Sequence, residues 1–136
     1  MDRHSQLDLP ARVSDGFDGL LGLELIELSA ERVRGRVSVR DELTRPGGAV
    51  HGGVYASLAE SLASLGTRSA VASERKLAAA VSTQASFLRP IRSGTIDAVA
   101  TARHRGRTTW VWEVEFSDDE GRLSVLARVT VDVRDA

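Results

Sequence analysis

Hydrophobic and polar residues alternate along much of the chain, which is the pattern of β-strands that turn one face toward a core. Between residues 32 and 40, Val33, Gly35, Val37 and Val39 alternate with arginine and serine, a period of two. Strands are expected from Leu23 onward, with further candidates at 77–88, 95–104, 108–117 and 123–134. These segments predict an antiparallel sheet with one solvent-exposed face.

One long segment, from His51 to about Val71, lacks the strand pattern and is predicted to form a helix. Leu58, Leu62 and Leu65 give it an apolar stripe. Its other positions hold many small residues, which would let a curved sheet approach the helix axis. Two strands, this helix and then a meander of three or four strands predict an α+β fold, in which an antiparallel sheet of five or six strands wraps one long central helix.

Composition places the chain among single-domain proteins. Its 136 residues, 42% hydrophobic and 27% charged, are enough for one compact core, so we interpret 1–136 as one domain with a weakly structured lead over 1–16. A short helix is expected near 17–21. The net charge of -1 gives no field to attract nucleic acid or an anionic membrane. No secretion signal or membrane span is recognisable, and we expect a cytoplasmic protein.

Metal and thiol chemistry are not expected. The chain has no cysteine, which excludes disulfides and thiolate ligands. Its three histidines, His4, His51 and His104, are scattered and no carboxylate lies at ligand spacing beside them. The acidic run 118–121 ends in glycine and is interpreted as a hairpin turn rather than a calcium loop. We therefore expect neither a metal nor a cofactor.

Glu60 is the residue that is hardest to explain as structure. It lies among apolar and small residues of the predicted helix, between Ala59 and Leu62. A carboxylate in an apolar setting is unfavourable unless it is paired or protonated. The structural alternative is a surface glutamate on the polar face of an amphipathic helix.

The sequence His51-Gly52-Gly53 begins the same helix. The first turn of a helix has backbone N–H groups without intrahelical partners, and glycine allows a ligand to approach the backbone. Such a site could polarise a carbonyl group, although the glycines could instead only serve the turn. Gly52 and Glu60 are roughly 12 Å apart along one helix at 1.5 Å per residue. If both act on one carbonyl, a second chain related by a two-fold axis must supply one of them.

The segments 48–54 and 58–61 carry a resemblance to a known family, which extends from about Gly19 to Val133. The chain resembles the hotdog-fold acyl-CoA thioesterases, in the branch similar to hydroxybenzoyl-CoA and phenylacetate-pathway thioesterases. This resemblance implies a hotdog fold and the hydrolysis of an acyl-CoA to a free acid and coenzyme A. The branch favours an aryl or phenylacetyl-type acyl group.

The resemblance also implies catalytic roles. Glu60 matches the family's catalytic carboxylate, acting as nucleophile or general base, and the Gly52 N–H matches the donor that polarises the thioester. His51 lies beside the site, and Ser64 matches a hydroxyl that helps to hold water. Six positions before the histidine the family usually has Gln or Asn as a second donor, whereas this chain has Arg45, which is longer and charged.

Segments 84–90 and 104–109 resemble family segments that line the acyl pocket and the coenzyme A path. The implied substrate-binding residues are Gly53, Ala80, Phe87, Leu88, Arg89, Pro90, His104, Arg105, Gly106, Arg107, Thr108 and Thr109. Residues 89–107 hold five arginines against one acid, Asp97, which predicts a basic cluster suited to nucleotide phosphates. An ordinary arginine-rich hairpin tip is the alternative.

Two other functions remain open. A hotdog-fold acyl-thioester hydratase or dehydratase would use a catalytic histidine, for which His51 is the candidate. A non-catalytic acyl-CoA-binding protein is the second alternative. In each case we expect an acyl-CoA ligand. We also expect a homo-oligomer that is at least a dimer, with a homotetramer formed as a dimer of dimers. Neither nucleic acid nor a membrane is expected as a partner.

Overall fold

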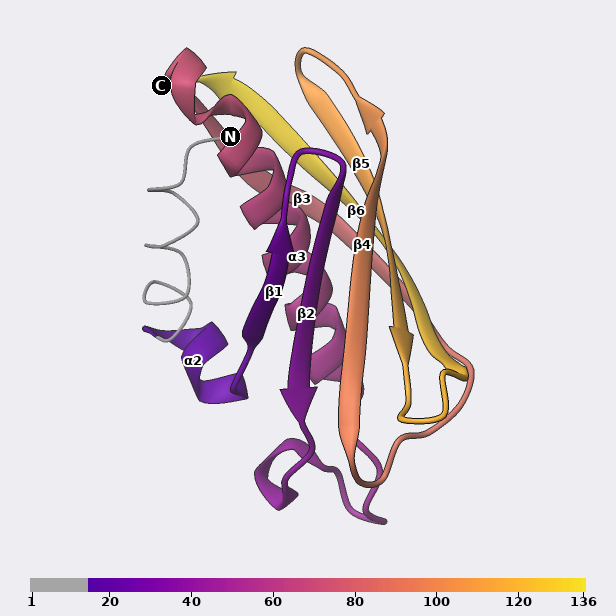
Figure 1. Ribbon diagram of the computed structural model, residues 1–136. Helices are drawn as coiled ribbons and strands as arrows, with labels where there is room; N and C mark the ends of the chain where they lie inside the picture. Colours follow the sequence, from indigo (N-terminus) through magenta and orange to yellow (C-terminus); the bar gives the residue numbers. More distant parts are fainter. Residues whose placement is uncertain (1–14) are drawn as a thin grey trace.

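In the computed structural model, which describes residues 15–136, one long helix packs against one face of a six-stranded antiparallel sheet (Figure 1). This confirms the predicted α+β hotdog architecture. The helices are α2 (Phe17–Leu21), α3 (Gly52–Val71) and the 3-10 turns η1 (Asp41–Leu43) and η2 (Ala72–Glu74). The strands are β1 (Glu24–Leu28), β2 (Arg32–Ser38), β3 (Lys76–Phe87), β4 (Thr95–Arg105), β5 (Thr109–Ser117) and β6 (Leu123–Asp135). Most of the predicted N-terminal lead, residues 1–14, lies outside the described residues.

The order of strands in the sheet is β1-β2-β4-β5-β6-β3. The sequence predicted a meander of three or four strands. The structure has a meander of three strands, β4 to β6, and β3 is not part of it. Strand β3 precedes β4 in the chain but lies at the far edge, where it pairs with β6 from Lys76↔Asp135 to Phe87↔Val125. The reason is that α3 crosses the face of the sheet and delivers the chain to the edge opposite β1 (Figure 1).

The helix and sheet are in unusually close contact around Gly66. A Cβ atom at Gly66 would lie 2.5 Å from the ring of Trp112 on β5, so only glycine fits there. The buried Trp112 Nε1 donates a hydrogen bond to Thr67 Oγ1 at 2.8 Å, and the Thr67 hydroxyl donates to the Ala63 carbonyl at 2.9 Å. The small residues predicted to admit a curved sheet therefore do so, and one polar contact fixes the helix on β5.

The short helix α2 is attached to α3 and to the segment between β2 and η1 by side-chain hydrogen bonds. Ser61 on α3 donates to Asp18 Oδ1 at 2.6 Å. The Arg40 guanidinium donates to the carbonyls of Leu20 and Leu21, which end the helix. These contacts supply the stability that a helix of five residues lacks by itself.

Strand β3 forms an edge of the sheet, and three of its large apolar side chains are exposed: Leu77, Val81 and Phe87. Its register against β6 shifts between Ala80 and Ser82, so Val81 is a bulge residue.

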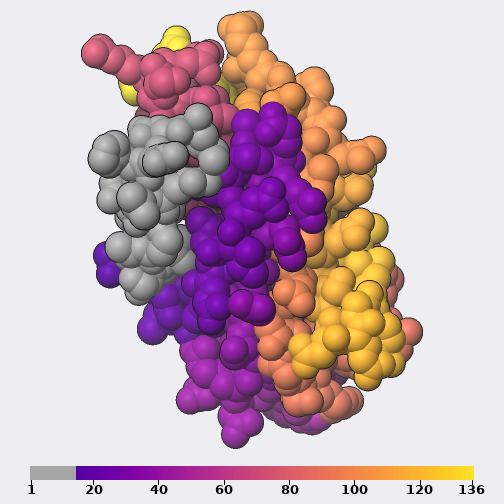
Figure 2. Space-filling model, viewed as in Figure 1, coloured from indigo at the N-terminus to yellow at the C-terminus, as the bar shows by residue number. Residues whose placement is uncertain are grey.

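No helix among residues 15–136 is long and apolar enough to cross a membrane. In the space-filling view, the segment before α3 forms one end of the molecule (Figure 2). The segment that joins α3 to β3 and the turn between β4 and β5 form the other end.

Candidate active site

His51 caps the N-terminus of α3. Its backbone is extended, with φ -64° and ψ 135°, and its Nδ1 accepts a hydrogen bond from the Gly53 N–H at 2.8 Å. The His51 N–H donates to the Leu43 carbonyl at 2.8 Å, which ties the cap to η1. Because Nδ1 accepts a hydrogen bond, it carries no proton, and the proton of the neutral ring is on Nε2. The Gly53 N–H is therefore already bonded within the helix cap and is not available to a ligand.

The Gly52 N–H, unlike that of Gly53, is not bonded by the cap. It has no hydrogen-bond acceptor within residues 15–136, whereas the next two N–H groups donate to His51. An open N–H at a helix start, where the helix dipole is positive, can stabilise a developing oxyanion. The ring of Phe87 also lies against Gly52, because a Cβ atom there would be 3.0 Å from that ring.

Glu60 is exposed in this chain, so the apolar surroundings predicted for its carboxylate are wrong for the single chain. The physical reason is that its neighbours Ala59 and Leu62 point into the core, while Glu60 occupies the helix face that is turned away from the sheet. Its carboxylate forms no hydrogen bond or ion pair with the part of the chain that the structure describes. It is therefore free to meet a substrate or a second chain.

Ser64 follows Glu60 by one helical turn and is half-buried. Its hydroxyl has no protein partner among the described residues. Ser57 donates to the Gly53 carbonyl at 2.7 Å and Ser61 to Asp18. Of these three serines, Ser64 is the one whose hydroxyl is available to hold a water molecule next to Glu60.

Arg45 lies in the loop that leads to α3, and its guanidinium donates to the carbonyl of Pro46 at 3.1 Å. The loop is closed by backbone bonds from Arg45 N–H to the Ala49 carbonyl, 2.8 Å, and from Gly48 N–H to the Arg45 carbonyl, 2.9 Å. The exposed side chain is thus engaged by its own loop. A role as second carbonyl donor would require it to leave Pro46.

The residues that follow β3 lie beside the start of α3. The N–H groups of Leu88 and Arg89 both donate to the Ser124 carbonyl, at 2.8 and 3.0 Å, and Pro90 follows. All three side chains are exposed, as is Phe87. Farther along β3, Ala80 is half-buried and packs against the core.

Tyr55 is a polar residue near this end of the molecule that the sequence pattern did not single out. Its ring packs edge-on against Phe116, with centroids 5.3 Å apart, and lies 6.2 Å from the ring of Phe87. Its hydroxyl is buried and has no hydrogen-bond partner within residues 15–136. Burial raises the pKa of Tyr55, and the nearby Ser124 hydroxyl offsets part of that increase. Tyr55 is therefore a neutral group.

The arginines of residues 89–107, which were predicted to form one basic cluster, lie in two separate places in the single chain. The prediction of one cluster is therefore wrong for a single chain. Arg89 and Arg92 precede β4 at the end of the molecule where α3 starts, and Arg92 donates to the Gly47 carbonyl. Strand β4 runs from that end of the molecule to the opposite one (Figure 1), about 33 Å at about 3.3 Å per residue. Arg105 is its last residue, and Arg107 follows in the turn to β5. Arg105 is also paired with Glu31, at 3.1 Å.

The turn after β4 holds the remaining candidates, His104 to Thr109. Gly106 N–H donates to the Thr109 carbonyl at 2.9 Å. A Cβ atom at Gly106 would lie 2.7 Å from both that carbonyl oxygen and His104 Nε2, which explains the glycine. Thr108 accepts a hydrogen bond from the Val133 N–H at 2.9 Å. In one chain this turn is far from Gly52, so the sequence-predicted residues fall into two groups.

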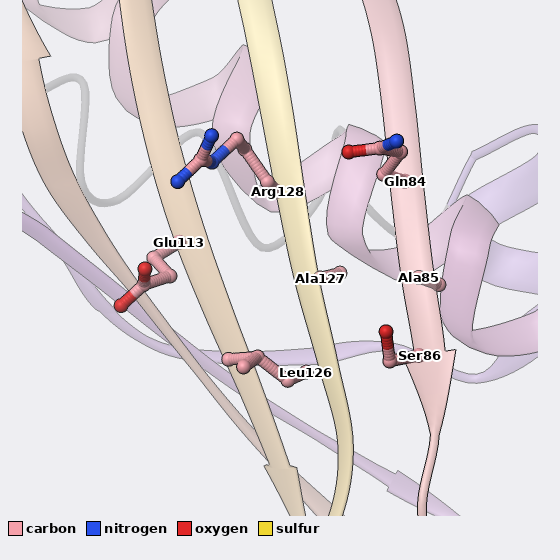
Figure 3. Close-up of a pocket in the computed structure, with 7 residues that line it drawn as sticks. All are labelled: Gln84, Ala85, Ser86, Glu113, Leu126, Ala127 and Arg128. Atoms are coloured by element: carbon pink, nitrogen blue, oxygen red, sulfur yellow. The ribbon is translucent and has the colours of Figure 1, made fainter.

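One surface depression, of about 270 Å³, lies over β3, β5 and β6 (Figure 3). Its lining includes Gln84, Glu113 and Arg128, which are opposite one another in register. This is the sheet face that points away from α3, since Trp112 and Val114 on either side of Glu113 are buried beneath the helix. It is therefore separate from the start of α3.

A second depression, of about 340 Å³, lies directly beside the first turns of α3. It is lined by Phe17, Leu21, Glu42, Leu43, Thr44, His51, Gly53, Val54 and Ser57. His51 and Gly53 were predicted as site residues from the sequence, whereas the contributions of α2 and η1 were not. Their apolar residues look like ordinary core residues in the pattern. Among residues 15–136, no group of three or more His, Asp or Glu residues is placed to hold a metal ion.

Comparison with known proteins gives a consistent result. A family model described as the thioesterase superfamily matches residues 47–125. A thioesterase of Pseudomonas aeruginosa has a similar structure, with a TM-score of 0.88 and 34% identity over 98% of this chain and 94% of that one. A thioesterase of Haemophilus influenzae has a TM-score of 0.88 at 29% identity, covering 95% of this chain and 90% of that one. A 1,4-dihydroxy-2-naphthoyl-CoA hydrolase of Listeria monocytogenes is 28% identical over 88% of this chain and 96% of that protein.

Proposed function

The chain belongs to the thioesterase superfamily, and we propose that it hydrolyses an acyl-CoA thioester to a free acid and coenzyme A. The observation that carries the proposal is that, among residues 15–136, the Gly52 N–H has no acceptor and the Glu60 carboxylate on the same helix has no partner. We favour an aryl or phenylacetyl-type acyl group. The name of the Listeria relative, a naphthoyl-CoA hydrolase, supports an aromatic acyl-CoA.

In the proposed reaction the Gly52 N–H donates to the thioester oxygen as negative charge develops there. Glu60 then acts by one of two routes. Its carboxylate attacks the carbonyl carbon, expels the coenzyme A thiolate and forms a mixed anhydride that water hydrolyses. Alternatively it removes a proton from a water molecule held by Ser64, and the water oxygen attacks the carbonyl carbon. The tetrahedral intermediate then breaks its C–S bond and expels the thiolate, which takes up a proton. Both routes end in the acid and the thiol.

The proposal requires two chains. Gly52 and Glu60 are eight residues apart in one unbroken helix, roughly 12 Å, so Glu60 must come from a partner. The exposed edge strand β3, with Leu77 and Val81, offers a surface for antiparallel pairing across a two-fold axis. Such pairing would also bring the Arg105 end of one chain toward the Arg89 end of the other, where both could contact coenzyme A phosphates.

The deciding experiment measures thiol release from benzoyl-CoA and phenylacetyl-CoA by Glu60→Gln. We expect a loss of about 10³-fold or more in kcat, since a positioned carboxylate contributes on that order. Glu74→Gln is the matched control, because Glu74 is also exposed but lies beyond the other end of α3. A Glu60→Gln variant with full activity would exclude both routes. In a single turnover in ¹⁸O-water, label in the Glu60 carboxylate would identify the anhydride route.

The capping role of His51 narrows the hydratase alternative to one ring nitrogen. His51 Nδ1 accepts the Gly53 N–H, so a proton transfer at carbon would have to use Nε2. Enoyl-CoA hydration without thiol release would favour that alternative. Binding of acyl-CoA with no turnover of any kind would favour the non-catalytic one.

A further inference from the structure

We propose that the depression between α2, η1 and α3 is the subsite for the acyl group, and that α2 determines which acyl groups fit. This inference rests on the proposed thioester hydrolysis. Apolar side chains of Phe17, Leu21, Leu43 and Val54 line the depression together with polar residues of η1 and α3. The ligand class is a compact apolar acyl group, of which a single aromatic ring is the simplest member.

The position of the depression follows from covalent geometry. The acyl substituent is bonded directly to the carbonyl carbon, so its subsite must begin next to the group that polarises the carbonyl oxygen. The residues on either side of Gly52, His51 and Gly53, both line the depression. The depression of Figure 3 does not meet this requirement, because β5 and its buried Trp112 separate it from α3.

The lining has the composition of a small-molecule site. Leu21, Leu43 and Val54 are buried and form an apolar floor, whereas Phe17 is 60% exposed. Small-molecule sites are mostly apolar with a few polar groups, and their volumes start at about 300 Å³. With about 340 Å³, this depression is at the small end of that range and has room for a single aromatic ring.

The wall that carries Phe17 is fixed to the helix that carries Glu60. Asp18, the neighbour of Phe17, accepts the hydrogen bond from Ser61, the neighbour of Glu60, at 2.6 Å. The Arg40 guanidinium holds the other end of α2 through the carbonyls of Leu20 and Leu21. These bonds fix the helix that carries Phe17 before the substrate binds, so less ordering is required when the acyl group contacts the Phe17 ring.

Phe17→Ala and Leu20→Ala form a matched pair that tests the subsite. Both residues are exposed apolar residues of α2, at 60% and 68%, but only Phe17 lines the depression. For Phe17→Ala we expect kcat/KM for benzoyl-CoA to fall about tenfold, the effect of losing roughly 55 Å² of apolar contact. For acetyl-CoA, which does not reach Phe17, we expect a change of less than about twofold. Leu20→Ala should leave both substrates within about twofold of wild type.

A binding measurement separates this inference from the hydrolytic function. Phenacyl-CoA thioether, which has a methylene between sulfur and carbonyl and resists hydrolysis, is titrated by calorimetry into each full-length variant. We expect binding about tenfold weaker for Phe17→Ala and unchanged for Leu20→Ala. That result with no hydrolysis of any acyl-CoA would support the subsite while contradicting the proposed function. The subsite is overturned if wild type does not bind the thioether, if the two variants behave alike, or if Phe17→Ala weakens acetyl-CoA and benzoyl-CoA hydrolysis equally.

Discussion

The ring of Phe87 rests on the backbone of Gly52, so closely that a Cβ atom at residue 52 would lie 3.0 Å from it. Phe87 ends β3 and Gly52 begins α3, so this contact joins the sheet edge to the helix start. Glycine at position 52 therefore has two separable properties. It gives Phe87 room, and it presents an N–H without an acceptor among residues 15–136.

Gly52→Pro tests the N–H itself. Proline at the first position of a helix is well tolerated, and the preceding His51 already has the extended backbone that proline requires, with φ -64° and ψ 135°. We expect Gly52→Pro to fold and to lose about 10² to 10³-fold in kcat, the typical effect of removing one oxyanion donor. Thiol release from benzoyl-CoA measures this loss.

Gly52→Ala is the control for that experiment. It adds the same Cβ atom against the Phe87 ring but keeps the N–H. Any loss shared by both variants reports the steric contact, and the additional loss in Gly52→Pro reports the hydrogen bond. Equal activity of the two variants would show that the Gly52 N–H does not act on the substrate.

His51 can be tested as a cap. Its Nδ1 accepts the Gly53 N–H, a bond that an asparagine side chain can replace and alanine cannot. We expect His51→Ala to lower the free energy of unfolding by about 1 kcal/mol and His51→Asn to change it by less than half of that. Urea unfolding measures both. If His51 acts only as a cap, His51→Asn should also retain hydrolysis within about tenfold, and a complete loss would instead assign it a chemical role.

The local elements could be predicted from the sequence because periodicity is a local property. The helix expected over 51–71 is α3, and the strand expected over 123–134 is β6, each within one residue at either end. Gly66 could also be anticipated as a close contact, since small residues were concentrated in the helix. The partner of Gly66, Trp112, could not be identified, because it depends on which strand crosses the helix at that point.

What could not be predicted depends on contacts between distant segments or chains. The edge position of β3 follows from the route of α3 across the sheet, which no local pattern encodes. The arginines between 89 and 107 are close in sequence, but the extended strand β4 separates them. The surroundings of Glu60 depend on whether a second chain covers the exposed face of α3. The small and apolar residues around Glu60 in the sequence do not show whether its helix face meets solvent or a partner.

The contact between Thr67 and Trp112 gives a prediction about stability. Thr67→Val keeps the shape of the side chain but leaves the buried Trp112 Nε1 without its acceptor. We expect a loss of about 1 to 3 kcal/mol in the free energy of unfolding, the cost of one unsatisfied buried donor. Thr67→Ser keeps the hydroxyl and should lose less. Urea unfolding of the two variants decides this, and a Val variant as stable as the Ser variant would contradict it.

Asp118 predicts a dependence of stability on acid. The backbone N–H of Arg122 and, to a smaller extent, its guanidinium hold the pKa of Asp118 below its ordinary value of 3.8. Because the pKa is lower in the folded state, the stabilisation is present above pH 3.8 and is lost as the pH falls through the folded value. Asp118→Asn should therefore flatten the decrease in unfolding free energy below about pH 4. The exposed Asp15→Asn is the control, and parallel pH profiles for wild type and Asp118→Asn would contradict the prediction.

Mixing two inactive variants tests whether the site is shared between chains. If Glu60 of one chain acts beside Gly52 of its partner, a heterodimer of Glu60→Gln with Gly52→Pro contains one site with both native groups and one with neither. After denaturation and joint refolding in equal amounts, half of the dimers are heterodimers, so about a quarter of wild-type activity should return.

The same mixing experiment distinguishes the shared site from its alternative. If both groups acted within one chain, every site in every dimer would lack one of them, and mixing would restore nothing. Along α3, Gly52 and Glu60 of one chain are roughly 12 Å apart, which is too far for both to contact one carbonyl group.

Val81→Lys supplies the structural control, because a charge on the exposed bulge of β3 should disfavour edge pairing. Introduced into both chains, it should lower the sedimentation mass and abolish the recovered activity together, since the site would exist only in the dimer.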